Sequence, residues 1–293
     1  MSDARQPAAS GPDVVITGIP RSGTSYFCTL FNALRECVAI NEPEDIFQHL
    51  GDAGPPWGLR AYYARMRADI LAGRPVGNMM ADGRFIEDTA TGAREEWYVP
   101  QVSGPGFLFA TKNTLAYLAR LPQVAAALPE ATCLACVRHP FDAVASWKST
   151  FHNLTHAAVQ SIRVGFVGDP LLTEPGRKRV AEIAATEPVE RRRALFWRHL
   201  ALLLLEAGPR VAEIIRYESL VGDPEGVMRR VWAGTIPAAP AFEPLRPLEP
   251  SAVRHARRGN LTAADVAAIR EICGEVASRF GYDVADEAKA GEG

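Results

Sequence analysis

The sequence predicts an α/β fold in three layers, with a central parallel sheet covered by helices on both sides. Short runs of β-branched and apolar residues alternate with helical patterns along most of the 293 residues. This alternation is typical of parallel sheets built from strand–helix–strand units. Polar residues also close several of the strand-like runs, at the edge where such sheets bind ligands.

The first strand is predicted over residues 14–17 (VVIT), four β-branched residues in a row. Gly18 and Pro20 end this strand, and residues 24–34 resume with a helical pattern. A strand, a glycine loop and a helix in this order direct loop N–H groups and the positive end of the helix dipole at one point. We therefore expect an anionic ligand such as a phosphate, although such turns also occur without any ligand.

The loop differs from the common nucleotide-triphosphate loop, G-x-x-x-x-G-K-[ST]. Residues 18–25 match both glycines and the last hydroxyl, but Thr24 stands where lysine is usual. Without that lysine, the β- and γ-phosphates of ATP lose their main cationic contact. Arg21 instead offers a planar fork of donors that suits a tetrahedral oxyanion. The loop therefore favours an anion other than a γ-phosphate.

The later elements follow in chain order. A short apolar segment at residues 38–40 ends in an acidic loop. Three further strands are predicted from apolar runs, at residues 107–111, 132–137 and 211–216. Helices are predicted at residues 60–72, 141–150, 189–207, 225–231 and 262–279, and another after Thr114 that is interrupted at Pro122. The last helix begins with Thr262 and Asp265 at the spacing of a capping box.

Residues 51–106 differ in composition from the rest of the chain. They are rich in Gly, Pro, Trp and Arg, and apart from the helix at 60–72 we expect them to be irregular. Long irregular segments in a compact domain are typical of binding loops or lids. We therefore expect one domain over residues 13–284, in which residues 51–106 form an irregular insertion. The small polar residues at 1–12 and 285–293 predict disordered tails.

Composition excludes some classes of partner. The net charge of −2 and the pI near 6.3 provide no field for nucleic acid or an anionic membrane. The longest apolar run, residues 200–205, is too short to span a bilayer, and residues 1–12 lack the pattern of a signal peptide. These features predict a cytoplasmic protein, and nothing in the sequence indicates its oligomeric state.

Cysteine and histidine spacing does not favour a metal site. The five cysteines are scattered through apolar segments, as expected in a reducing compartment. Cys133 and Cys136 form a C-x-x-C pair, but three residues along a strand place them on opposite faces, which favours buried packing. His152 and His156 have a helical ligand spacing without a third ligand. We expect no metal.

Three segments resemble the sulfotransferases that use 3′-phosphoadenosine 5′-phosphosulfate. They are PRSGTS at residues 20–25, VRHPFDAVAS at residues 137–146, and RYESL at residues 216–220 followed by Asp223-Pro224. The resemblance implies the P-loop-like sulfotransferase topology and transfer of a sulfuryl group to a hydroxyl, less readily an amine, without a metal. The acceptor would be a small molecule, a glycan or a lipid. The Ala-, Arg- and Pro-rich composition is typical of a bacterium with a GC-rich genome.

The resemblance also implies roles in binding the donor. In the family, the first motif cradles the 5′-phosphosulfate; here it comprises Pro20, Arg21, Ser22, Gly23, Thr24 and Ser25. An arginine at a strand end and a serine eight residues later hold the 3′-phosphate, which matches Arg138 and Ser146. Tyr217 matches the tyrosine beside the adenine. Arg257 and Arg258 lie in a basic segment similar to one that touches the 3′-phosphate, although other parts of that segment are missing.

The catalytic residues are also implied by the resemblance. Lys112 matches the strand-end lysine beside the transferred group, where it would stabilise the leaving group together with Arg21. The small-molecule branch continues Lys-Thr-His, with the histidine as base, whereas this chain continues Asn113-Thr114. The protein-tyrosine branch has a glutamate twenty-one residues after the loop arginine, which corresponds here to Glu42. We predict Glu42 as the general base; the alternative is that it belongs to a solvated acidic loop.

Two other functions remain open from the sequence alone. A P-loop kinase of unusual loop sequence would require ATP and Mg²⁺. A non-catalytic nucleotide-binding protein would bind the donor without turning over any acceptor.

Overall fold

The computed structural model describes residues 10–50, 57–90, 92–162, 164–251 and 258–285. Five parallel strands form the main sheet in the spatial order β2-β6-β1-β7-β8. Their bounds are β1 (Asp13–Gly18), β2 (Cys37–Asn41), β6 (Leu108–Lys112), β7 (Thr132–Val137) and β8 (Glu213–Arg216). Because all five strands run in the same direction, their carboxyl ends lie at one edge. The predicted α/β class with a central parallel sheet is confirmed.

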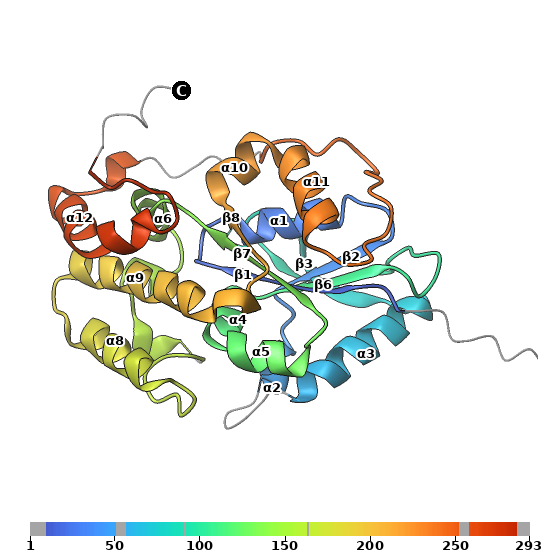
Figure 1. Ribbon diagram of the computed structural model, residues 1–293, viewed down its shortest axis with the longest axis horizontal. Coiled ribbons are helices and arrows are strands. Elements are labelled where there is room, and N and C mark those ends of the chain that lie inside the picture. Colours follow the sequence, from blue (N-terminus) through green and yellow to red (C-terminus); the bar gives the residue numbers. More distant parts are fainter. Residues whose placement is uncertain (1–9, 51–56, 91, 163, 252–257, 286–293) are drawn as a thin grey trace, which may run out of the picture.

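Helices cover both faces of this sheet (Figure 1). One face carries α1 (Thr24–Phe31), α10 (Tyr217–Gly222) and α11 (Pro224–Gly234). The other helices are α2 (Ile46–His49), α3 (Trp57–Leu71), α4 (Leu115–Ala119), α5 (Leu121–Ala127), α6 (Pro140–Trp147), α7 (His152–Thr155), α8 (Glu174–Ala185), α9 (Val189–Ala207) and α12 (Ala263–Ser278). Successive residues of β1 enter different cores: Val14 and Ile16 pack with α1 and α11, and Val15 packs with the opposite group. This alternation is the three-layer arrangement expected from the strand period.

Asp265 at the start of α12 joins three helices. The predicted capping box with Thr262 is present. The buried Asp265 carboxylate also accepts hydrogen bonds from Arg193 of α9 and from Lys148 at the end of α6, each at 2.6 Å. Burial alone raises the pKa of Asp265, but the hydrogen bonds from Lys148 and Arg193 outweigh it and lower the pKa to about 2. Asp265 therefore stays charged and holds α6, α9 and α12 together.

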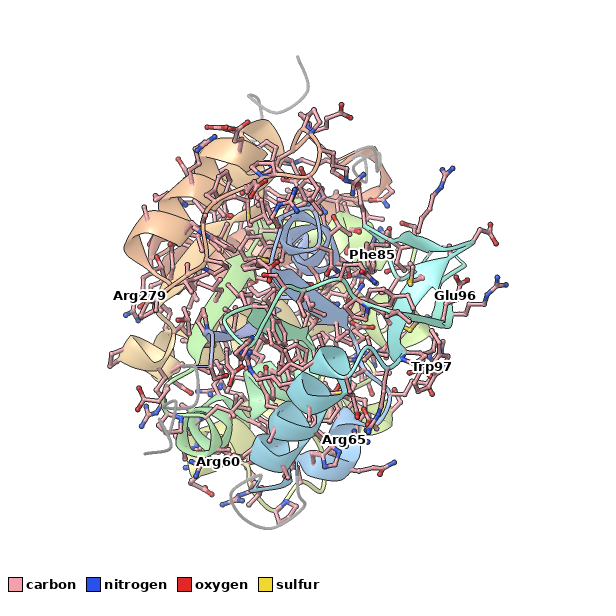
Figure 2. The ribbon with its side chains drawn as sticks, turned by 90° about the vertical axis from the view of Figure 1, so that its right-hand side faces the viewer. Arg60, Arg65, Phe85, Glu96, Trp97 and Arg279 are labelled. Atoms are coloured by element: carbon pink, nitrogen blue, oxygen red, sulfur yellow. The ribbon has the colours of Figure 1, made fainter. Side chains whose placement is uncertain are left out.

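The expectation that residues 51–106 lack regular structure, apart from one helix, is wrong. The described part of this region contains α3 and a second, antiparallel sheet in the order β4-β3-β5. Its strands are β3 (Val76–Ala81), β4 (Arg84–Phe85) and β5 (Arg94–Tyr98). Figure 2 shows this sheet at the side of the molecule, with Phe85, Glu96 and Trp97 on it. The region is therefore a folded attachment to the main sheet.

A buried asparagine attaches the small sheet to the main one. The Asn78 side chain of β3 accepts a hydrogen bond from the Asn41 N–H at 2.8 Å and donates one to the Ala39 carbonyl at 2.9 Å. These are backbone groups of β2, the edge strand of the main sheet. Asn78 thereby pairs the Asn41 N–H of the edge strand and shares the Ala39 carbonyl with Asn32, which donates to it at 2.7 Å.

The cysteines and the chain ends are placed as follows by the structure: the prediction for the cysteines is confirmed, and the prediction for Gly11 and Pro12 is wrong. Cys133 and Cys136 do lie in different cores on opposite faces of β7, and all five cysteines are buried and free. Gly11 and Pro12 are not disordered, because Arg67 donates hydrogen bonds to both carbonyls at 2.8 Å. Residues 1–9 and 286–293, most of the two predicted tails, lie outside the described residues. Within the described ranges, no helix is long and apolar enough to cross a membrane, and no group of three His, Cys, Asp or Glu residues is placed to bind a metal.

Candidate active site

A pocket of about 470 Å³ lies at the carboxyl ends of the main strands. Five of its lining residues close or directly follow the five strands: Arg21 after β1, Glu42 after β2, Lys112 at the end of β6, Arg138 after β7 and Tyr217 after β8. These residues are far apart in sequence and meet because the strands are parallel. The prediction that polar residues gather at this edge is confirmed.

The loop after β1 depends on its two glycines. A Cβ at Gly18 would lie 2.2 Å from the carbonyl oxygen of Cys136, so only glycine lets β1 approach β7 this closely. Gly23 has a φ of 78°, and a Cβ there would lie 2.6 Å from the Tyr217 ring. The Trp147 indole donates a hydrogen bond to the Pro20 carbonyl at 2.9 Å. The loop is therefore fixed between β7, α6 and α10.

Most of the predicted loop residues face the pocket. Its lining includes Pro20, Arg21, Gly23, Thr24 and Ser25. Ser22 is buried instead, and its hydroxyl has no hydrogen-bond partner among the described residues. The Thr24 hydroxyl lies 3.2 Å from that of Thr114. The residue that replaces the usual lysine thus connects the loop to the segment after β6.

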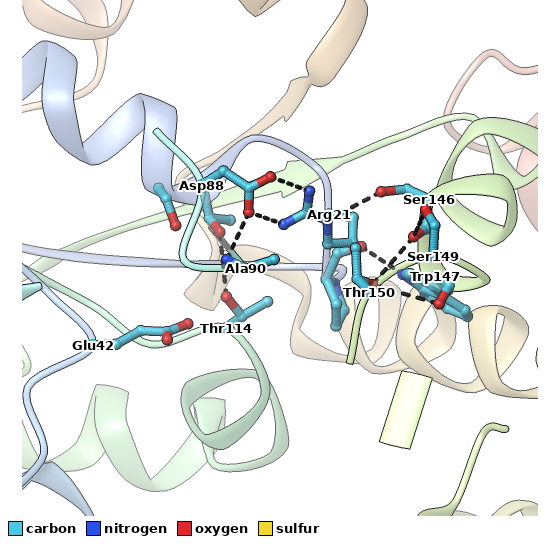
Figure 3. A network of polar contacts seen from close by, with 12 residues as sticks. Arg21, Glu42, Asp88, Ala90, Thr114, Ser146, Trp147, Ser149 and Thr150 are labelled. Atoms are coloured by element: carbon cyan, nitrogen blue, oxygen red, sulfur yellow. Dashed lines mark hydrogen bonds and ion pairs between the residues drawn. The ribbon is translucent and has the colours of Figure 1, made fainter. Parts of the chain in front are cut away.

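Arg21 is bound by an aspartate that the sequence did not single out. Its φ of 68° is unusual for a residue other than glycine. Both terminal nitrogens donate to the Asp88 carboxylate, and Nε donates to the Ser146 hydroxyl at 3.0 Å (Figure 3). Burial raises the pKa of Asp88, but the hydrogen bonds and charge of Arg21 outweigh it and hold the pKa below its usual range. The Asp88 carboxylate therefore lies where an anionic ligand of Arg21 would lie.

Arg138 lines the pocket and is almost completely buried. Its side chain is 5 % exposed; one terminal nitrogen donates to the Arg21 carbonyl at 3.0 Å, and Cζ lies 4.3 Å from the centre of the Tyr217 ring. Its Nε has no hydrogen-bond partner in the described part of the chain. Burial lowers the pKa of Arg138, because it disfavours the charged guanidinium. A buried cation with a free donor suits an anion such as a phosphate.

Lys112 and Glu42 form an ion pair at the opposite side of the pocket. The buried Lys112 ammonium lies 2.6 Å from Glu42 Oε1 and 3.2 Å from the Ser25 hydroxyl. Glu42 has a φ of 48°, and its N–H donates to the Lys112 carbonyl at 2.8 Å. Its side chain is half-buried. Glu42 thus lies in the pocket, joined to the end of β6 by backbone and side chain.

The basic residues near the C-terminus are placed differently. Arg257 lies outside the described residues. Arg258 donates two hydrogen bonds of 2.8 Å to Asp142 of α6 and does not line the pocket. Asp142 precedes Ser146 by about one helical turn. The structure therefore brings Arg258 to the helix that carries Ser146, but not into the pocket.

Comparisons with known proteins identify a family and several similar solved structures. The profile of the sulfotransferase family matches residues 12–234. The solved sulfotransferase from Alicyclobacillus acidocaldarius is 16% identical, with 94% of this chain and 98% of that chain covered and a TM-score of 0.45. A sulfotransferase from Mycobacterium avium is 14% identical, with 94% and 78% covered and a TM-score of 0.44. The sulfotransferase domain from the curacin biosynthetic pathway is 14% identical, with 94% and 99% covered and a TM-score of 0.42.

None of the curated proteins compared with this chain matches it. The family match nevertheless spans every strand of the main sheet and five of the strand-end residues that line the pocket. The chain therefore belongs to the sulfotransferase family.

Proposed function

We propose that this protein transfers a sulfuryl group from 3′-phosphoadenosine 5′-phosphosulfate to a hydroxyl, less readily an amine, of an acceptor. The observation that carries the proposal is the pair of arginines at the ends of neighbouring strands, Arg21 after β1 and Arg138 after β7. A donor with anionic groups at both its 5′ and 3′ positions needs two such cations. ATP carries no 3′-phosphate and would leave the buried donor of Arg138 unmatched.

The residues around these arginines suit the two ends of the donor. The loop from Pro20 to Ser25 would hold the 5′-phosphosulfate, with its N–H groups at the start of α1. Arg138 and Ser146 would hold the 3′-phosphate, and Tyr217 would lie beside the adenine. Arg257 stays a predicted contact to the 3′-phosphate, whereas Arg258, paired with Asp142 of α6 and outside the pocket lining, would support Ser146 through that helix.

The transfer step assigns a role to each charged group. The acceptor oxygen forms a bond to sulfur while the bond from sulfur to the 5′-phosphate oxygen breaks, and the acceptor proton passes to Glu42. The products are a sulfate ester and adenosine 3′,5′-bisphosphate. Lys112 and Arg21 would stabilise the negative charge that develops on the departing phosphate oxygen. The 2.6 Å contact between Lys112 and Glu42 supports placing both at the reacting atoms.

Binding of the spent donor tests this proposal. We expect calorimetry to show that adenosine 3′,5′-bisphosphate binds more tightly than ADP or ATP with Mg²⁺ at the same salt concentration. Tighter binding of ATP with Mg²⁺ would favour a kinase. Binding of the bisphosphate without turnover of any acceptor would favour a non-catalytic binding protein.

A substitution of Arg138 tests its proposed contact with the 3′-phosphate. Arg138→Ala is expected to weaken bisphosphate binding by on the order of 1.5–3 kcal/mol, because a buried charge-assisted contact is lost. Arg216→Ala is the matched control: Arg216 is an exposed arginine at the end of β8, packed on the Tyr282 ring and outside the pocket lining. Equal losses in the two variants would contradict the role of Arg138.

A further inference from the structure

The two ends of the pocket differ in polarity. The arginines proposed to bind the donor lie at the ends of β1 and β7, and Lys112 marks the point of transfer at the end of β6. The lining also holds apolar side chains that come from α2, β3, α4 and the segments on either side of α7. We call these six residues the apolar wall: Phe47, Met79, Leu115, Phe151, Ile162 and Val164. The donor does not need this part of the pocket, so the wall is available to the acceptor.

The apolar wall is built on the main core. Leu115, Ile162 and Val164 are partly buried and pack against the larger hydrophobic cluster. Gly165, next to Val164, has a φ of 83°, and a Cβ there would lie 2.1 Å from Cβ of Ala119 in α4. The segment after α7 thus packs in direct contact with the helix that begins at Leu115. Because these residues are held by packing, the wall is present before any acceptor binds.

Two phenylalanines of the wall are exposed to solvent. Phe47 of α2 is 39 % exposed and Phe151, just before α7, is 41 % exposed. They come from different segments, yet both line this one pocket. Exposed aromatic rings gathered at a pocket are typical of a site that buries an apolar ligand.

The charges at this side of the pocket are negative. Glu42, Glu44 and Glu87 line the pocket together with Asp88. Among the described lining residues, the cations are Arg21, Lys112 and Arg138, and the first two face Asp88 and Glu42. Two of these three cations are thus already paired with carboxylates, and Arg138 lies at the end proposed for the donor, so an anionic acceptor would meet carboxylates without a cation to pair with.

We infer that the acceptor is an uncharged alcohol or phenol with a hydrocarbon body, and that it is not anionic. This inference rests on the proposed sulfotransferase activity. The hydrocarbon body would lie on the apolar wall and direct its hydroxyl to Glu42 and Lys112.

Matched acceptors test the inference with the full chain and radiolabelled donor. We expect transfer to 2-naphthol and 1-octanol, and a kcat/KM for each that is at least about tenfold above those for 6-hydroxy-2-naphthoate and 8-hydroxyoctanoate, a difference of about 1.4 kcal/mol. These carboxylated partners differ chiefly in charge. Comparable or better transfer to the carboxylates would overturn the inference.

Substitutions in the apolar wall test whether its residues bind the acceptor. Ile162→Asp and the milder Phe151→Ala should raise the KM for 2-naphthol and leave the Kd of adenosine 3′,5′-bisphosphate within a few-fold of wild type. Val167→Asp is the control, since Val167 is an apolar residue of the same segment that is 51 % exposed and outside the pocket lining. Equal changes in KM for Val167→Asp and Phe151→Ala would overturn the assignment of the wall.

The bisphosphate measurement separates this inference from the proposed function. If the bisphosphate does not bind, the proposed function fails. The fluorescence of 2-naphthol measures its binding to the complex of the protein with the bisphosphate. If the bisphosphate binds but this complex does not bind 2-naphthol, only the inference of an apolar acceptor is excluded.

Discussion

The pocket holds two carboxylate–cation pairs that differ in how the carboxylate is used. Asp88 contacts Arg21 through both oxygens and is buried, so neither oxygen is available for a reacting group. Glu42 contacts Lys112 through Oε1 alone and is half-buried. Its second oxygen has no hydrogen-bond partner in the described ranges. This difference favours Glu42 over Asp88 as the group that accepts a proton.

Glu42→Gln is therefore expected to abolish turnover while the Kd of adenosine 3′,5′-bisphosphate stays within a few-fold of wild type. The amide keeps the shape of the side chain but cannot take the acceptor proton. Single-turnover assays and calorimetry measure the two quantities. Asp45→Asn is the control, because Asp45 is paired with Arg65 on the surface. Turnover of Glu42→Gln near the wild-type rate would show that Glu42 is a member of a solvated acidic loop.

Asp88→Asn is expected to bind the bisphosphate several-fold more tightly than the wild type. The 5′-phosphate has to replace the Asp88 carboxylate on Arg21, and an amide removes the competing negative charge. Calorimetry at two salt concentrations measures the change, which should shrink at the higher one. Weaker binding would mean instead that Asp88 holds Arg21 in its productive position.

At this scale the sequence identified residues through its motifs and missed those placed by tertiary structure. Arg21 stands inside the glycine loop, and Arg138 and Glu42 were assigned through the resemblance to sulfotransferase motifs; the structure places all three in the pocket. Their functional roles stay predictions. Asp88 and the apolar wall were missed because no local pattern indicates that a loop after β4 or a segment after α7 reaches the ends of the main strands.

Among the elements, buried strands were the most predictable and the second sheet the least. The strands of the main sheet read as apolar runs because both faces are covered. The antiparallel sheet was missed, although Asp82-Gly83 is a strong hairpin signal. Both residues have positive φ values, 51° and 74°, as a two-residue turn between β3 and β4 requires. The surrounding Gly and Arg residues obscured the alternation of buried residues in β3.

The packing of α8 on α9 gives a prediction about pH. His199 of α9 is 1 % exposed and accepts a hydrogen bond from Arg179 of α8 at 3.2 Å. Burial and, to a smaller degree, the charge of Arg179 lower its pKa from 6.5 to about 3. Between these values the unfolded chain binds a proton that the folded chain does not, so the stability falls as the pH falls from 6.5 towards 3.

His199→Gln is therefore expected to reduce the pH dependence of the free energy of unfolding. In the wild type, this histidine is expected to lower the free energy of unfolding by about 2 kcal/mol between about pH 7.5 and about pH 5. Urea unfolding at the two pH values measures it. The exposed His152 provides the control variant His152→Gln. An unchanged pH dependence in His199→Gln would contradict the assignment.

At the scale of the whole molecule, the site exists only when the sheet is assembled. Four of its charged residues and Tyr217 come from the ends of the five strands, so none of the elements carries the site by itself. The alternation of strands and helices predicted this arrangement, because parallel strands bring their carboxyl ends together. It did not predict which segments cover the acceptor side, since that depends on side-chain packing between distant helices.

Ligand binding should therefore stabilise the whole fold. At 100 times its Kd, adenosine 3′,5′-bisphosphate is expected to add about 2.7 kcal/mol to the free energy of unfolding and to raise the Tm by several degrees. ATP with Mg²⁺ at the same concentration is expected to give a smaller shift. Differential scanning calorimetry measures both shifts in Tm. A larger shift with ATP would count against binding of the donor by both Arg21 and Arg138.

The contacts of Asp265 define how much of the chain is needed for a stable fold. The family match ends at residue 234, before α12, yet Asp265 neutralises the buried Arg193 and orders Lys148, which ends the helix that carries Ser146. Truncation at residue 234 would remove Asp265 together with the apolar residues of α12, such as Ile269 and Ile272, that share a core cluster with α9. Arg193 would lose its counter-ion as its surroundings open to water, and Lys148 would lose the contact that orders it. The minimal folding unit therefore extends beyond the segment matched by the family profile, and the C-terminal helix helps to hold in place α6, the helix that carries Ser146.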